Sequence, residues 1–232
     1  MTPKDFASSM IKSFAVYEGM GEISRCNSLA SLPVNKSFNS LALDTSVPYP
    51  DVFFHGLKLD HYNFQLQDYS FFQFSYNSEN DIRYAFYPSP YGPSELAQIQ
   101  ELKGMLEHDE IDAEAYTTFI QEINKNYSRS LIRYEYNTDQ YRPGVHPASH
   151  FHIGTHGEDR WTVEKRLTPL AFSLLIGKLY FSHHWECLTV FNHENIRLSN
   201  EFDSQLLREK AICSVTPGEK FTIHDKSTFY FL

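Results

Sequence analysis

Hydrophobic and polar residues alternate along three consecutive segments between residues 60 and 87, separated by short polar breaks. Residues i and i+2 of a β-strand lie on the same face of a sheet, so this alternation indicates strands with one buried face. Three such segments in succession predict an antiparallel β-meander. Its buried face is expected to carry Tyr62, Phe64, Leu66, Phe72, Phe74, Tyr76, Ile82, Tyr84 and Phe86.

Three other regions have the apolar spacing of helices. Residues 4–19 repeat apolar side chains every three to four positions, after a capping residue at Thr2 and a first-turn proline at Pro3. We expect a helical hairpin over 93–124, opened by a proline and divided by an acidic break, and a buried apolar helix over 168–182. The expected packing positions of the hairpin are Leu102, Leu106, Tyr116, Phe119, Ile120 and Ile123.

The rest of the chain has shorter or weaker patterns. Residues 130–136 and 149–153 alternate and are expected to be strands joined by a proline-rich connection. Residues 21–50, rich in Ser, Asn and Pro, are expected to form a long loop over the core. Near the end we expect a helix around 201–211 and a final hairpin in residues 221–232.

These elements predict one α+β domain over residues 1–232, with an antiparallel sheet, a helical hairpin insertion and a buried apolar helix. Its expected segments are an N-terminal helix and loop (1–50), the β-meander (60–87), the helical hairpin (93–124), the histidine-rich strands and apolar helix (130–182) and a C-terminal segment (183–232).

Composition limits the class of protein. The 232 residues are 16% aromatic with 10 Gly and 11 Pro, which excludes a disordered or fibrous chain. The formal charge of −9 excludes a protein that coats nucleic acid by neutralising phosphates, so any such contact needs a local patch or a partner. Three widely spaced cysteines suit a reducing compartment. Because no signal-peptide core or membrane span is found, we expect a cytoplasmic protein without membrane contact.

The candidate chemistry lies in residues 141–160, where four of the eleven histidines are found: His146, His150, His152 and His156. If 149–153 is a strand, His150 and His152 lie on the same face, and Phe151 and Ile153 lie on the opposite, buried face. Two adjacent imidazoles repel each other when both are charged, so neutral, metal-binding or proton-transferring forms are favoured.

The preceding strand adds two charged residues to this face. Arg133 and Glu135 are two positions apart, so antiparallel pairing of 130–136 with 149–153 brings them beside His150 and His152. One chemistry is a divalent metal (Mg, Mn or Zn) bound by the imidazoles and the carboxylate. The other is metal-free, with one His as base, the other as acid, and Arg133 or Arg142 stabilising phosphate charge. The alternative is a solvated strand face without function.

These residues resemble a bacterial family, the domain of unknown function family 2290. The resemblance rests on RYEYNTDQYRPGVHPASHFHIG (133–154) and LTPLAFSLLIGKLYF (167–181). The matched positions are Arg133, Tyr141, Arg142, His146, Ser149, His150, His152 and Gly154. The family has no established activity. Its genes occur beside helicase genes in defence islands, so the resemblance implies a helicase partner and an anti-phage role.

The leading hypothesis is a phage-defence component that acts on nucleic acid with a helicase, as a nuclease-like effector. Its catalytic residues are predicted to be His150, His152, Glu135 and Arg133, with His150 and His152 also as metal ligands, and its substrate-binding residues Arg142, Tyr141 and His146. One alternative is a non-catalytic adaptor or regulator of a helicase. Another is a metal-binding structural domain, in which the histidines hold the 137–156 loop in place.

Overall fold

A seven-stranded antiparallel sheet forms the centre of the computed structural model, which describes residues 1–155, 159–187, 189–191, 193–194 and 197–226. The strands lie side by side in chain order, each antiparallel to its neighbour, so that the predicted meander forms the middle of the sheet. They are β1 (Ile23–Cys26), β2 (Phe64–Leu66), β3 (Phe71–Ser78), β4 (Asp81–Tyr87), β5 (Ile132–Asn137), β6 (Ser149–Ile153) and β7 (Trp161–Thr162).

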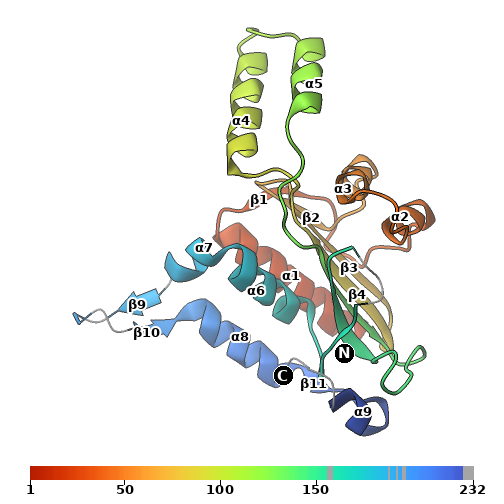
Figure 1. Cartoon of the computed structure of the whole chain (residues 1–232). Helices are drawn as coiled ribbons and strands as arrows, with labels where there is room; N and C mark the ends of the chain where they lie inside the picture. The colour runs from red at the N-terminus through yellow and green to blue at the C-terminus, as the bar shows by residue number, and fades with distance from the viewer. Residues whose placement is uncertain (156–158, 188, 192, 195–196, 227–232) are drawn as a thin grey trace.

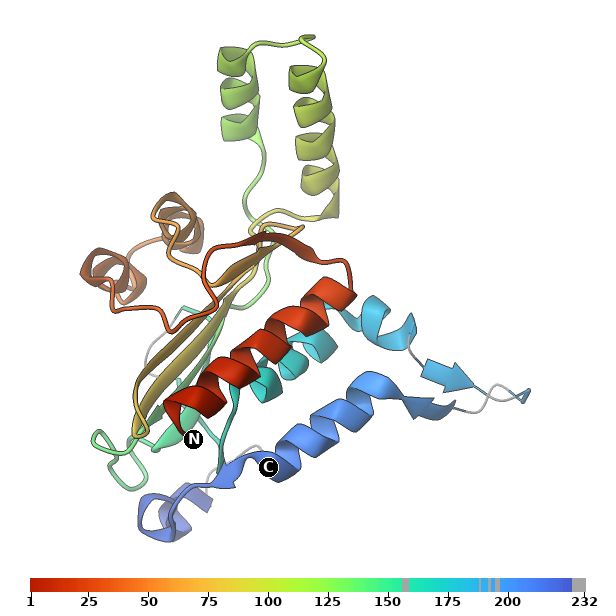
Figure 2. The same cartoon turned by 180° about the vertical axis from the view of Figure 1, so that it is seen from behind.

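Helices α1 (Pro3–Gly19) and α6 (Pro169–Tyr180) cover one face of this sheet (Figures 1 and 2). Both begin as the sequence predicts, because Thr2 and Thr168 accept hydrogen bonds from the first-turn backbone and a proline follows each cap. The main core lies between these helices and the sheet. It contains Phe64, Leu66, Phe72, Phe74, Ile82, Tyr84 and Phe86 of the meander, with Tyr76 partly buried against them, and Ile132, Tyr134, Tyr136 and Phe151 of β5 and β6. The prediction for Tyr62 is wrong, because this residue precedes β2 and packs against Phe71 in the cluster on the opposite face.

Helices α2 (Lys36–Ala42) and α3 (Tyr49–Lys58) lie on the opposite face of the sheet (Figure 1). They bury a second cluster around Phe38, Phe53 and Phe71 near one end of the strands. The polar side chains of β3, β4 and β5 beyond this cluster line an open hollow. One face of the sheet therefore carries the main apolar core, and the other carries polar groups at its middle.

The predicted loop over residues 21–50 is wrong in part. This segment contains β1, which pairs with β2, and α2, which is capped by Asn35. Both depend on long-range contacts: Phe38 is buried, and the Asn63 side chain donates hydrogen bonds to the carbonyl oxygens of Ser28 and Ala30. Weak local periodicity does not report such contacts.

The predicted helical hairpin is confirmed as α4 (Pro93–Glu107) and α5 (Ala113–Glu122), which project together from one end of the sheet (Figure 1). Asp112 caps the second helix. Tyr91, Ile99 and Ile123 are the buried residues of a small cluster at the base of the hairpin, whereas Phe119, a predicted packing position, is 43% exposed.

The C-terminal segment contains the predicted helix as α8 (Glu201–Ile212), which packs against α6. The prediction of a final hairpin is wrong for residues 223–226, which form α9 (Ile223–Lys226). Residues 227–232 of the predicted hairpin lie outside the described residues. The remaining elements are β8 (Lys165–Arg166), which pairs with β11 (Ser214–Val215), α7 (Ser182–Cys187), the pair β9 (Thr189–Phe191) and β10 (Arg197–Asn200), and a 3₁₀ turn (Gly218–Lys220).

The described residues form one α+β domain with the sheet, hairpin and buried helix that the sequence predicts. Cys26, Cys187 and Cys213 are all free thiols. Among the described residues, every helix is too short or too polar to span a bilayer.

Candidate functional site

The candidate site is built on the pairing of β5 with β6. In this antiparallel ladder Arg133 lies opposite His152, and Glu135 lies opposite His150. All four side chains therefore lie on the polar face, while Tyr134 and Phe151 between them point into the core. The predicted convergence of these residues is confirmed. Ile153, expected to be buried opposite them, is 37% exposed because it ends the strand.

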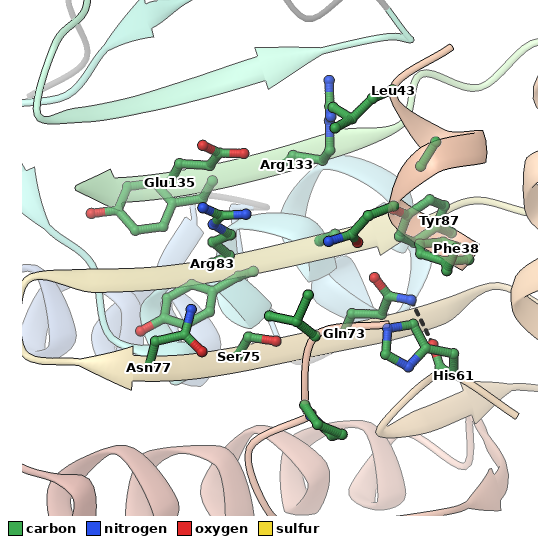
Figure 3. A pocket seen from close by; sticks show the side chains of 17 residues that line it. Phe38, Leu43, His61, Gln73, Ser75, Asn77, Arg83, Tyr87, Arg133 and Glu135 are labelled. Carbon is green, nitrogen blue, oxygen red and sulfur yellow. Dashed lines mark hydrogen bonds between the residues drawn. The ribbon is translucent and has the colours of Figure 1, made fainter. Parts of the chain in front are cut away.

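The same register continues across β4 and β3. Arg133 lies opposite Ala85, which lies opposite Gln73; Glu135 lies opposite Arg83, which lies opposite Ser75. Figure 3 shows Arg83, Arg133 and Glu135 rising from the same face of the strands. The polar face is thus organised in two cross-strand rows. The first row is Gln73, Ala85, Arg133 and His152, and the second is Ser75, Arg83, Glu135 and His150.

The two central histidines are buried and touch each other. Nε2 of His150 lies 3.0 Å from Nε2 of His152, and their ring centroids are 4.7 Å apart. Nδ1 of His150 lies 2.9 Å from the carbonyl oxygen of Pro147. Since a carbonyl oxygen only accepts, Nδ1 carries the proton, and Nε2 of the neutral ring presents its lone pair toward His152.

Their surroundings keep both imidazoles neutral. Burial lowers the pKa of His150 to about 3, and the neighbouring His152 and His146 add to this effect. Burial also lowers the pKa of His152 to about 3, reinforced by the charges of Arg133 and Arg160. His146, whose ring lies 5.0 Å from that of His150, has its pKa lowered by burial and by Arg160. At neutral pH these rings offer lone pairs, not acidic protons.

Glu135 completes a set of three metal-binding groups. A carboxylate oxygen of Glu135 and one ring nitrogen each of His150 and His152 lie within 4.8 Å of one another. Two imidazoles and a carboxylate are an ordinary donor set for a catalytic zinc, which keeps its fourth position open. Bonds of about 2.0–2.2 Å in tetrahedral geometry place donors roughly 3.3 Å apart, and the two Nε2 atoms, 3.0 Å apart, already have about this spacing. The carbonyl that orients His150 is the usual partner of a ligating imidazole.

Arg133 is a buried cation beside this trio, only 9% exposed. Its Nε and Nη2 atoms have no hydrogen-bond partner among the described residues. These two atoms form one edge of the guanidinium, the edge that binds a carboxylate or phosphate through two parallel hydrogen bonds. Leaving such a group unpaired inside a protein is costly, which indicates a site for a bound anion.

The charge around the trio is positive although the whole chain is acidic. Arg83 lies across from Glu135, and Arg133 and Arg160 both lower the pKa of His152. With neutral histidines, three guanidinium groups lie among two carboxylates, that of Glu135 and that of Asp81, whose Oδ1 lies 3.5 Å from Nε of Arg83. The site therefore has the local positive charge that an anionic substrate needs on a chain with a formal charge of −9.

The structure separates the three predicted substrate-binding residues. His146 joins the histidine pair. The hydroxyl of Tyr141 instead donates to Asp225 at 2.8 Å, which ties the loop to α9. Arg142 is exposed, and its backbone N–H and carbonyl pair with His146 in a tight turn. His156, the fourth clustered histidine, lies outside the described residues.

Sequence reasoning missed Arg83 and Arg160. Arg83 occupies a polar position of the predicted meander, so the alternation predicts that it lies on the polar face of the sheet. Its place beside Glu135 depends on the pairing of β4 with β5, which the alternation does not predict. Arg160 follows the histidine-rich loop with no periodic pattern around it.

Comparison with known proteins returned one match. The model of a family described as an uncharacterized conserved protein, DUF2290, matches residues 23–223. This range includes all seven strands of the sheet and every residue of the candidate site. No curated protein and no solved structure is significantly similar to the chain.

Proposed function

We propose, from the premise that this chain belongs to the DUF2290 family, that it is a metal-dependent phosphodiesterase acting on nucleic acid. One observation carries the proposal: the donor atoms of Glu135, His150 and His152 lie within 4.8 Å beside the unpaired guanidinium edge of Arg133. A metal trio next to an anion-binding group is the arrangement that hydrolysis of a phosphate ester requires.

Each residue has a role that follows from its surroundings. His150, His152 and Glu135 would hold the ion, with Pro147 fixing the orientation of the His150 ring. A divalent ion held by these three residues would supply Lewis acidity, which would make water a nucleophile at neutral pH. Arg133 binds the non-bridging oxygens of the phosphate and stabilises the charge that develops on them.

The lowered histidine pKa values favour this mechanism over the metal-free one. A histidine acting as general acid must carry a proton near neutral pH, but the pKa of each ring is about 3. Neutral imidazoles are metal ligands instead. Two nitrogens and one carboxylate suit Zn²⁺, and also Mn²⁺, better than Mg²⁺, which prefers oxygen ligands and retained waters.

The proposal is tested on purified protein without a histidine tag. Single-stranded and double-stranded DNA and RNA are incubated with Zn²⁺, Mn²⁺ or Mg²⁺, and cleavage is followed on denaturing gels. Loss of cleavage in His150→Ala, His152→Ala and Glu135→Gln, with His193→Ala as an exposed control, supports the proposal. Cleavage that survives all three substitutions rejects the site.

A helicase partner and a role in phage defence remain part of this proposal and rest on the family resemblance. The charge of −9 motivates a partner that delivers the nucleic acid strand. Co-purification of the chain with a helicase encoded beside it, and protection of cells against phage that depends on His152, are the expected results.

A second candidate function is that of a non-catalytic adaptor, favoured by the projecting α4–α5 hairpin. Residues 93–124 carry eight acidic residues and one lysine. The side chain of Phe119 on α5 is exposed. Such an arm suits a basic protein surface. This function predicts a complex that is lost on deleting the hairpin and kept in His152→Ala.

A further inference from the structure

A hollow of about 100 Å³ lies on the polar face of the sheet next to Arg133. Its floor is Ala85, the smallest residue of the row that also holds Gln73, Arg133 and His152. Because the alanine side chain ends at Cβ between two long polar neighbours, the row leaves space above it. Figure 3 shows this space between the strands and the segment that carries Phe38 and Leu43.

The wall of the hollow is apolar and the floor is polar. Val34 lines it from the segment before α2, Phe38 from within α2, Leu43 from the residue after α2, and Tyr87 from β4. Val34 is 57% exposed and Leu43 is 67% exposed, so the rim presents apolar side chains to solvent. A ligand that fits this site has an apolar face and a polar edge.

Two polar side chains flank the space above Ala85. Gln73 donates from its amide nitrogen to the carbonyl oxygen of His61, which orients the side chain and leaves its amide oxygen able to accept a hydrogen bond from a ligand (Figure 3). On the opposite side of Ala85, the Nε and Nη2 donors of Arg133 have no partner among the described residues and are the groups proposed above to bind the phosphate. An acceptor for the base edge and a pair of donors for the phosphate thus lie on either side of the same small floor.

We propose that this hollow binds one unpaired nucleobase, so that the substrate of the neighbouring trio is single-stranded nucleic acid. This inference rests on the proposed function. The faces of a base can contact the exposed apolar side chains of Val34 and Leu43, and its edge can donate to the amide oxygen of Gln73.

The position of the hollow relative to the trio agrees with this ligand. Ala85, Arg133 and His152 lie on adjacent strands, and adjacent strands are about 4.8 Å apart. The hollow therefore borders the trio: Glu135 is one of its lining residues, and His152 lies roughly 10 Å from Ala85, with Arg133 between them. A nucleotide whose phosphate lies at Arg133 and the trio extends its base toward Ala85. A base in a duplex is stacked and paired, so it does not reach such a site without leaving the helix.

Equilibrium binding tests the inference without any need for cleavage. Fluorescence anisotropy at fixed salt, with EDTA present, compares a labelled single-stranded oligonucleotide, the same oligonucleotide with abasic sites, and its duplex. The native chain is expected to bind the intact single strand about fivefold more tightly than the abasic strand and the duplex, the effect of about one net hydrogen bond from the base edge. Ala85→Leu, which fills the hollow, is expected to remove this preference.

A second pair of variants guards against misfolding of Ala85→Leu. Val34→Gln with Leu43→Gln changes only exposed rim residues, and its matched control, Val215→Gln with Leu207→Gln, changes residues of equal exposure (59% and 66%) on β11 and α8. The rim variant is expected to lose the preference for the intact strand, and the control to keep it. Equal affinity of the native chain for intact and abasic strands, or a rim variant that behaves as its control, overturns the inference.

Absence of nuclease activity would reject the proposed function but not this inference, because base-dependent binding is measured separately. Conversely, metal-dependent cleavage with no preference for intact over abasic strands would retain the function and reject the nucleobase site.

Discussion

Nε2 of His150 and Nε2 of His152 lie 3.0 Å apart in the buried part of the polar sheet face. The carbonyl oxygen of Pro147 holds the proton of His150 on Nδ1, so the His150 lone pair is directed at its neighbour. Without a metal, Nε2–H of His152 can donate a hydrogen bond to Nε2 of His150. With a metal bound, the lone pairs of both Nε2 atoms would point at the ion. Each prediction below depends on the groups around this pair.

Metal content is the first test. We expect about one zinc or manganese ion per chain in protein purified without a tag, and less than a tenth of that in His152→Ala or Glu135→Gln, since each removes one of three ligands. Elemental analysis after dialysis gives the ratio. His184→Ala, which alters a histidine paired with Glu22 away from the trio, is the control. Native protein that binds no ion under saturating metal contradicts the assignment.

Stability is expected to fall as pH falls below about 6.5 in metal-free protein. Both histidines have a folded-state pKa of about 3, below their unfolded value of about 6.5, so the unfolded chain binds more protons between these limits. The free energy of unfolding then drops by up to about 1.4 kcal/mol per pH unit for each histidine.

Urea denaturation at several pH values between 7 and 5 measures this slope. His152→Gln removes one titrating ring and is expected to reduce the slope, whereas substitution of the exposed His193 leaves it unchanged. An unchanged slope in His152→Gln shows that the ring does not stay neutral in the folded chain.

Replacing Arg133 is expected to lower the cleavage activity without lowering the stability of the fold. Arg133→Met keeps the bulk of the side chain but removes a buried cation with two unpaired donors. Stability is expected to stay equal or rise by about 1 kcal/mol, because an unpaired buried charge is costly. Cleavage is expected to fall about 10²-fold, the usual effect of removing a group that stabilises transition-state charge. A large loss of stability would show that Arg133 is a structural residue.

Tyr134 connects the site strand β5 to the segment before α6. Its hydroxyl lies 2.9 Å from Ser149 Oγ and accepts the backbone N–H of Leu167 at 2.9 Å. Tyr134→Phe leaves that N–H without its partner and is expected to cost about 1–3 kcal/mol of unfolding free energy. Chemical denaturation measures the change, with Tyr127→Phe at a 39% exposed position as the matched control. Equal effects of the two substitutions would contradict this role.

Local patterns predicted most of the fold because they report properties of single elements. Alternation placed most core residues of the meander on one face, a cap with a proline marked the first turn of α1, and an apolar run marked α6. The errors fall where long-range contacts stabilise an element with a weak pattern. Examples are α2, held by burial of Phe38, and α9, where Asp225 accepts hydrogen bonds from Tyr141 and Thr222.

The sequence by itself determined which side chains of β5 and β6 share a face, because the two-residue period of a strand is a local property. Only the tertiary structure decided that the histidines are neutral, that Arg133 is buried without a partner, and that Ala85 leaves a hollow beside it. These features depend on desolvation and on charges from several distant segments. Such groups come together only when the strands pair in register and α2 packs over their end.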